Sequence, residues 1–200
     1  MFAIDTIQPS LFGDTAPSPD DGFAALERID LDPLSWLDFA PGWLAGDTRL
    51  FDFLTKTVQW QQPEVRMYEK MVRTPRLVGQ VDPDSHPVLQ SMADLLSDRY
   101  RIRMDRVSAG WYRIGADSVA WHGDRIAREL PHSIVATVSL GGPRRFLIRP
   151  QGGGESRAFD LGAGDLLVMG GACQRLWEHT VPKVASAPPR IALMFRHSYD

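Results

Sequence analysis

The sequence predicts an α+β fold that is mainly β, in which supporting N-terminal helices precede a jelly-roll core. After residue 100, apolar side chains recur at every second position in short runs that Gly and Pro separate, as in sandwiches, barrels and jelly rolls. Before residue 100, two segments have the spacing of amphipathic helices. No repeat or linker divides the 200 residues, so we expect one domain.

Residues 1–22 are polar and rich in Asp and Pro, so we expect a loose N-terminal arm. The domain then covers residues 23–200, and its jelly-roll core covers about 105–197.

The first helix is expected near residues 46–58 and the second near residues 86–99. Ser85 is placed to cap the second helix, and Pro87 suits its first turn, where no backbone N–H is needed. The expected strands are residues 106–112, 117–122, 134–140, 144–149, 156–161, 165–169, 175–182 and 190–197.

Charge is unevenly distributed along the chain. The formal net charge is -3, yet residues 1–50 hold nine acids and two bases, which leaves 20 bases and 16 acids in the rest. A modestly basic body could meet phosphates, whereas a solvated arginine surface explains the same pattern equally well.

Nothing in the sequence indicates a membrane or an oxidising compartment. No apolar run approaches the roughly 20 residues that cross a bilayer, and the N-terminus lacks the basic segment of a secretory signal. Cys173 is the only cysteine, so no intrachain disulfide can form. We expect a cytoplasmic monomer.

The segment His122-Gly123-Asp124 is a candidate metal-binding element. In an extended chain, residues i and i+2 point to the same side with Cα atoms about 6.5 Å apart, so an imidazole and a carboxylate can share one ion. His179 ends a strand-like run and can supply a third ligand. Two His and one carboxylate form the facial triad of non-haem Fe(II) oxygenases, although a lone His-x-Asp is more often a surface pair.

The strand at 190–196 makes this interpretation more specific. Alternation places Arg190, Ala192 and Arg196 on one face. The small Ala192 leaves room for a short dicarboxylate, with one carboxylate on each planar guanidinium. The alternative is an exposed face with two solvated arginines.

These residues resemble the AlkB family of 2-oxoglutarate/Fe(II) dioxygenases over most of the chain. The C-terminal strand matches the family's Arg-x-Asn-x-Thr-Phe-Arg signature at both arginines and at the phenylalanine. The resemblance implies a double-stranded β-helix core that uses Fe(II), 2-oxoglutarate and O₂. The densest similarity lies in residues 112–124, 137–141, 164–171, 177–179 and 190–196.

The resemblance also implies roles for individual residues. Arg190 and Tyr112 resemble the pair that holds the distal carboxylate of 2-oxoglutarate, and Arg196 resembles the arginine near the carboxylate that chelates iron. A segment at about 60–80 resembles the family's lid over the nucleotide. The implied iron ligands are His122, Asp124 and His179, and the substrate-binding candidates are Trp60, Tyr68, Met71, Arg76 and Arg145.

Three positions depart from the family pattern. Gly110 and Ala192 each replace an Asn, which removes hydrogen bonds to the cosubstrate, and Ile126 replaces an Asp that helps to read the damaged base. Other conspicuous residues are expected to be structural or exposed, namely Trp111, Trp121, Trp177, Met169, Cys173, His132 and His197.

The resemblance implies oxidative dealkylation of N-methylated bases in alkylated DNA or RNA, with release of formaldehyde, succinate and CO₂. Two alternatives stay open. The same chemistry could act on a protein or a small molecule, which Ile126 and the negative net charge favour. The chain could also be a jelly-roll binding module without activity.

Overall fold

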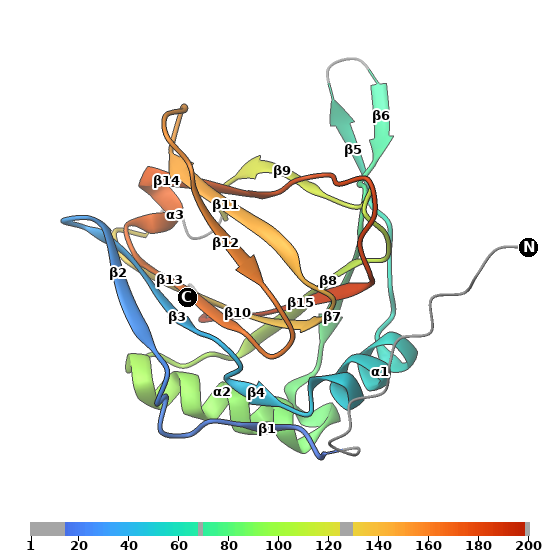
Figure 1. The fold of residues 1–200 in the computed structure, drawn as a ribbon, viewed down its shortest axis with the longest axis vertical. Coiled ribbons are helices and arrows are strands. Elements are labelled where there is room, and N and C mark those ends of the chain that lie inside the picture. The colour runs from blue at the N-terminus through green and yellow to red at the C-terminus, as the bar shows by residue number, and fades with distance from the viewer. Residues whose placement is uncertain (1–14, 68–69, 125–129, 199–200) are drawn as a thin grey trace, which may run out of the picture.

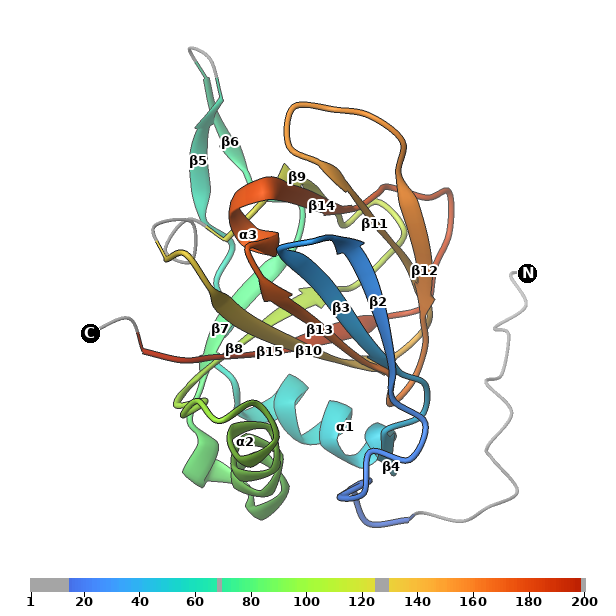
Figure 2. The ribbon, with the colours of Figure 1, turned by 90° about the vertical axis from the view of Figure 1, so that its left-hand side faces the viewer.

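The period-two alternation after residue 100 forms two antiparallel sheets, and two helices cover the outer side of the larger sheet (Figure 1 and Figure 2). This arrangement comes from a computed structural model, which describes residues 15–67, 70–124 and 130–198, with the backbone alone for 65–67 and 70. The predicted fold class, a jelly-roll core with N-terminal helices, is confirmed.

The larger sheet has seven strands, three of which come from before residue 100. The core therefore uses more of the chain than the expected residues 105–197. In spatial order the strands are β2 (Glu27–Asp32), β3 (Ser35–Ala40), β13 (Leu166–Gly171), β10 (Ser133–Gly141), β15 (Arg190–Arg196), β8 (Arg106–Tyr112) and β7 (Leu77–Val81).

The smaller sheet has four strands. The strand expected at 175–182 begins only at Trp177, because the short helix α3 (Cys173–Leu176) precedes it. In spatial order the strands are β12 (Arg157–Leu161), β11 (Arg144–Pro150), β14 (Trp177–Val181) and β9 (Val119–His122). The two remaining pairs are β1 (Ser18–Pro19) with β4 (Leu44–Ala45) and β5 (Glu64–Met67) with β6 (Lys70–Arg73).

Helices α1 (Asp47–Thr57) and α2 (Pro87–Tyr100) lie where the sequence predicts them. The predicted cap of α2 is wrong, since His86 caps it through Nδ1, which accepts from the N–H of Val88 at 3.2 Å. Ser85 instead belongs to the 3-10 turn η1 (Pro83–Ser85). No helix in the described part of the chain is long and apolar enough to cross a membrane.

Alternation along β15 divides the interior into two layers. Ile191, Leu193 and Phe195 are fully buried in the cluster that the large sheet forms with α1 and α2. Arg190 and Ala192 face the other way, toward the smaller sheet, and Ala192 belongs to a second apolar cluster there. The predicted alternation of this strand is therefore confirmed.

Residues 15–22 are ordered by contacts with the body and do not form a loose arm. Strand β1 pairs with β4, and the indole Nε1 of Trp43 donates to the carbonyl oxygen of Asp20 at 2.9 Å. The ring of Phe23 stacks on Trp43 with centroids 5.6 Å apart. A buried indole N–H needs an acceptor, which explains why this segment is tied down. Residues 1–14 lie outside the described residues.

The expected lid at 60–80 divides into three parts. Trp60 packs on the core, with its ring centroid 5.3 Å from that of Trp111. Strands β5 and β6 form a hairpin that projects from the body (Figure 1 and Figure 2), and β7 is an edge strand of the large sheet. A role of this segment as a lid stays a prediction.

Candidate active site

A cavity of about 640 Å³ lies between the two sheets. Its walls come from strands β7, β8, β10, β13 and β15 of the large sheet, from β9, β11 and β14 of the small one, and from residues within 57–61 and 82–85. The predicted metal and cosubstrate residues all line it, namely Tyr112, His122, Asp124, His179, Arg190 and Arg196.

His122 and His179 lie side by side because β9 pairs with β14 at these two positions. Their ring centroids are 4.3 Å apart, and Phe146 stacks on His179 at 5.3 Å. The strand register thus brings together two imidazoles that are far apart in the sequence.

The hydrogen bonds of His122 leave one ring nitrogen available to a metal. Its Nδ1 lies 2.8 Å from the carbonyl oxygen of Ala120 and 3.1 Å from that of His179. Carbonyl oxygens only accept, so Nδ1 carries the proton and donates. Nε2 therefore keeps its lone pair, the usual arrangement of a histidine that binds a metal.

Burial lowers the pKa of both imidazoles. The pKa of His179 falls to about 3 because the ring is desolvated and because His122 is close. The pKa of His122 is also lowered, again chiefly by burial. Both rings are thus neutral at pH 7, the form in which histidine binds metals.

Asp124 is held by two neighbours. Arg196 Nε donates to Asp124 Oδ2 at 2.5 Å, and the backbone N–H of Asp124 donates to Gln174 Oε1 at 2.9 Å. Burial acts to raise the pKa of the carboxyl, but the charge and hydrogen bond of Arg196 outweigh it, so the pKa lies below its usual range. The carboxylate is therefore ionised.

Within the described ranges, no three His, Cys, Asp or Glu side chains already form a metal-binding group. At this site the carboxylate of Asp124 is engaged by Arg196. The donor set still fits Fe(II), because two neutral imidazoles and one ionised carboxylate are the ligand types of non-haem iron oxygenases. The assignment of His122, Asp124 and His179 as ligands stays a prediction.

The opposite end of the cavity contains a buried cation. Arg190 lies opposite Tyr112 in the pairing of β15 with β8, and its side chain is 1% exposed. Its Nε donates to Ser139 Oγ at 2.8 Å, whereas its buried Nη1 has no partner among the described residues. Burial lowers the pKa of Arg190 to about 10, so it is charged at pH 7. A buried cation with a spare donor suits an incoming carboxylate.

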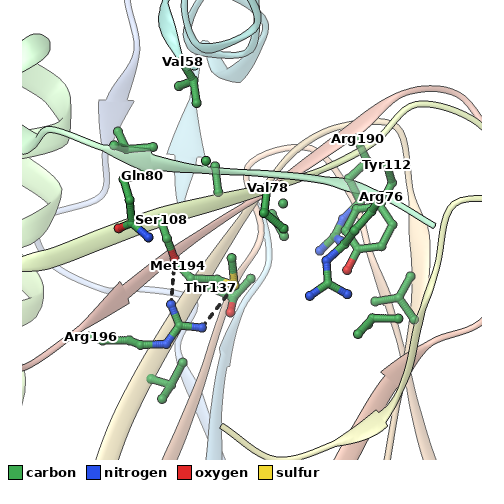
Figure 3. A pocket seen from close by; sticks show the side chains of 18 of the residues that line it. Val58, Arg76, Val78, Gln80, Ser108, Tyr112, Thr137, Arg190, Met194 and Arg196 are labelled. Carbon is green, nitrogen blue, oxygen red and sulfur yellow. Dashed lines mark hydrogen bonds between the residues drawn. The ribbon is translucent and has the colours of Figure 1, made fainter. Parts of the chain in front are cut away.

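The two ends of the cavity are distinct. Figure 3 shows Arg190, Tyr112 and Arg76 gathered on one side, and Arg196 bound to Ser108 and Met194 on the other. Arg196 Nη1 donates to Ser108 Oγ at 2.8 Å, and Nη2 donates to the Met194 sulfur at 3.4 Å. The Arg196 end thus has an ion-pair partner in Asp124, whereas no carboxylate of the described residues forms a salt bridge with Arg190.

The substrate-binding candidates are not brought together. Arg76 lines the cavity, but Trp60 packs against the core, and Met71 is 61% exposed on β6. Arg145 is exposed on β11, where it pairs with Asp160 at 3.6 Å. Trp60 and Arg145 therefore do not line the cavity, and Tyr68 lies outside the described residues.

Sequence reasoning missed the polar residues that hold the site. Gln174 is almost fully buried in α3 and accepts from the N–H of Asp124. Ser139 and Ser108 bind the two arginines of β15. Ser139 is one of three buried hydroxyl residues in β10, with Ser133 and Thr137, so the strand does not single it out, and nothing local marks Gln174.

Comparison with known proteins identifies the class. The family model of the 2OG-Fe(II) oxygenase superfamily matches residues 55–196. The chain belongs to this superfamily, whose members use Fe(II), 2-oxoglutarate and O₂.

Within the superfamily, the chain is AlkB-like. It is 30% identical to human "Alpha-ketoglutarate-dependent dioxygenase alkB homolog 3" over 158 residues, which is 73% of this chain and 55% of that protein. It is 28% identical to "DNA oxidative demethylase ALKBH2" of Arabidopsis thaliana, with 80% of this chain and 63% of that protein covered. The chain therefore spans about half to two thirds of the length of these relatives.

A solved structure shares the fold. OsALKBH1 superposes with a TM-score of 0.60 and 15% sequence identity, which covers 86% of this chain and 100% of that one. The likeness supports the architecture of two facing sheets with helices on the outer side of the larger one.

Proposed function

We propose that this protein is an Fe(II)- and 2-oxoglutarate-dependent dioxygenase that oxidatively dealkylates N-methylated bases in DNA or RNA. The products are formaldehyde, succinate and CO₂. One observation carries the proposal: a single cavity has two neutral imidazoles beside an ionised carboxylate at one end and an uncompensated buried guanidinium at the other. The relatives named as dioxygenase and DNA oxidative demethylase support it.

His122, His179 and Asp124 are the residues that would hold Fe(II). When bound together with 2-oxoglutarate and O₂, the metal supplies the oxidation of a C–H bond in an N-methyl group, a step that no side chain can perform. Asp124 accepts from Arg196 through Oδ2, so its other oxygen could bind the ion while the ion pair is kept.

The arginines of β15 orient the cosubstrate. The spare Nη1 of Arg190, beside Tyr112, receives the distal carboxylate. Arg196 lies next to Asp124 and can receive the carboxylate nearer the metal. Phe146 and the other apolar side chains that line the cavity exclude water from the reacting groups.

The methylated base has to leave its stack to reach this cavity. Alkylation that blocks base pairing lowers the cost of flipping, which contributes to selectivity. The hairpin of β5 and β6, which projects from the body, is the segment placed to meet the nucleic acid (Figure 2).

Formaldehyde release from a panel of defined oligonucleotides tests the proposal. The panel holds 1-methyladenine and 3-methylcytosine in single-stranded DNA, duplex DNA and RNA, with Fe(II), 2-oxoglutarate and ascorbate. We expect release from at least one member and none with His179→Ala. His132→Ala is the matched control, since His132 is exposed and does not line the cavity. Absence of release from every member would overturn the nucleic-acid substrate.

The second candidate is the same chemistry on a protein or a small molecule. This candidate is favoured because several arginines are engaged by the protein itself and are less available to phosphates. Arg144 is buried, Arg149 pairs with Glu178 at 2.7 Å, and Arg145 pairs with Asp160. The net charge of -3 favours it too. Succinate formation without any oligonucleotide product, together with no oligonucleotide binding at low salt, would select this candidate.

A further inference from the structure

Arg76 comes from the segment between β6 and β7 and lines the same cavity as the predicted cosubstrate residues. Its guanidinium lies over the ring of Tyr112, 5.8 Å from the centroid. Arg190 lies 5.5 Å from the same centroid. Arg144, which is buried and does not line the cavity, lies 5.4 Å from it as well. Three guanidinium groups therefore approach one phenol, and two of them, Arg76 and Arg190, line the cavity (Figure 3).

The Arg76 side chain lies against Gly110, which has no side chain of its own. A Cβ placed on Gly110 would lie 3.5 Å from Nε and 3.6 Å from Cδ of Arg76, and 3.7 Å from Tyr112. Gly110 pairs with Ala192 across β8 and β15, so two small residues lie side by side beneath this arginine. A larger side chain at Gly110 would compete with Arg76 for this position.

No ion pair among the described residues balances the charges of Arg76 and Arg190. The charge of Asp165 acts on Arg190, but its carboxylate accepts from the backbone N–H groups of Gly42 and Gly162 and forms no salt bridge with either arginine. Two cations near one another repel, and the repulsion is relieved when a carboxylate binds between them. The pair is thus arranged for an anion.

We propose that Arg76 is a second guanidinium ligand of the distal carboxylate of 2-oxoglutarate and takes the place of the side-chain donor that Gly110 lacks. This inference rests on the proposed function. It assigns Arg76 to the cosubstrate, whereas its position in the expected lid suggested the nucleic acid. The cosubstrate is favoured because Arg76 lies beside Tyr112 and above Gly110, inside the cavity, and not on the projecting hairpin.

The test is calorimetric titration of the Mn(II)-loaded protein, which binds the cosubstrate without turnover. The ligands are 2-oxoglutarate and 2-oxobutyrate, which has the same keto-acid group but no distal carboxylate. Arg76→Met should weaken 2-oxoglutarate binding by about 10- to 100-fold, the effect of losing a charge-assisted hydrogen bond, and should leave 2-oxobutyrate binding unchanged. Arg103→Met is the matched control, because that side chain is 88% exposed and lies outside the cavity.

A second variant tests whether a side-chain donor at position 110 can replace the guanidinium of Arg76. Adding Gly110→Asn to Arg76→Met places an amide donor in the vacated space and should recover part of the lost affinity. Thermal unfolding of each variant without ligand checks that the fold is retained.

Four outcomes would overturn the inference. Unchanged 2-oxoglutarate affinity in Arg76→Met removes Arg76 from the cosubstrate site, and weaker binding of a methylated oligonucleotide alone would reassign it to the substrate. An equal loss for both keto acids would indicate damage to the metal end. If the wild-type protein binds no 2-oxoglutarate, both this inference and the proposed function fail. The other outcomes overturn only the role of Arg76.

Discussion

Arg190 and Arg196 leave the same face of β15 and reach chemically different ends of one cavity. At the first end, Arg190 is buried beside Tyr112 with a hydroxyl partner and a spare donor. At the second end, Arg196 is partly exposed and bonded to the carboxylate of Asp124. One end thus has an unbalanced cation and the other a completed ion pair.

The difference shows what each end requires from a ligand. An unbalanced buried cation destabilises the ligand-free protein. An anion that binds beside the cation removes this cost, so the cosubstrate carboxylate gains binding free energy at this end. A completed pair stabilises the empty protein, and its carboxylate has to be shared when a metal arrives.

The carboxylate of Asp124 forms the ion pair with Arg196 and is also a predicted metal ligand. Asp124→Asn should therefore have the largest effect on turnover. The substitution keeps the shape of the side chain and removes the negative charge. We expect turnover to fall on the order of a thousandfold, because a neutral amide is a poor ligand for Fe(II). Formaldehyde release and Mn(II) binding measure the effect, and Asp160→Asn on the exposed edge is the control. Retained Mn(II) affinity in Asp124→Asn would remove this residue from the metal site.

Arg190→Met should separate ligand binding from stability at the unbalanced end. The affinity for 2-oxoglutarate should fall by about 100-fold, because the carboxylate loses a charge-assisted, forked partner. The ligand-free protein should be unchanged or more stable by about 1 kcal/mol, since an apolar side chain replaces a buried cation. Calorimetry and urea unfolding give the two values. A large loss of stability in the ligand-free protein would contradict the assignment of an unbalanced charge.

Arg196→Met should have the opposite effect on the ligand-free protein. It leaves the Asp124 carboxylate, whose side chain is only 19% exposed, without its partner. We expect a loss of about 2 kcal/mol in the free energy of unfolding, less than for a fully buried pair. Urea unfolding of Arg196→Met and Arg190→Met compares the free energies of unfolding of the two variants. Equal changes in both would contradict this prediction.

The imidazoles of the metal end predict a pH dependence of the metal-free protein. The pKa of His179 is about 3 when folded and near its ordinary 6.5 when unfolded, so between these values the unfolded chain binds more protons. Stability should therefore rise with pH from about 3 to 6.5, with a contribution of about 1.4 kcal/mol per pH unit. Urea unfolding of wild type and His179→Leu in EDTA isolates this contribution, and identical slopes would show that His179 is not buried in a neutral form.

Gln174 accepts from the backbone N–H of Asp124, a predicted metal ligand, and its substitution should have the smallest effect on metal affinity. Gln174→Leu removes the acceptor for the buried N–H of Asp124 and should cost about 1–2 kcal/mol of stability. Affinity for Mn(II) should fall by about 10-fold, as for other residues that orient a metal ligand. Gln90→Leu on the exposed face of α2 is the control, and unaltered Mn(II) affinity would show that Gln174 does not position Asp124.

The strands after residue 100 could be predicted to within a few residues because alternation is a local signal. Strand β3 was missed because it is buried on both faces and contains Asp38 at 1% exposure. Arg28 and Tyr100 satisfy that carboxylate at 2.7 Å and 3.0 Å, and such distant partners cannot be read from a local pattern. The N-terminal boundary was missed for the same reason, since β1 is fixed by pairing with β4.

The candidate site shows the same division between local and distant information. The residues predicted to bind the metal and the cosubstrate were found from the spacing of His122 and Asp124 and from the alternation of 190–196, and the structure brings them to one cavity. The contact of Arg76 with Gly110 could not be predicted from the sequence, because it depends on how β7 lies beside β8. The ion pair of Asp124 with Arg196 likewise joins residues 72 positions apart.

A crystal structure of the complex with Mn(II) and 2-oxoglutarate tests the two-ended cavity most directly. We predict an ion on His122, His179 and Asp124, with the Asp124 carboxylate shared between Arg196 and the metal. The distal carboxylate of the cosubstrate should lie against Nη1 of Arg190. An ion held by other residues, or a cosubstrate bound outside this cavity, would contradict the account.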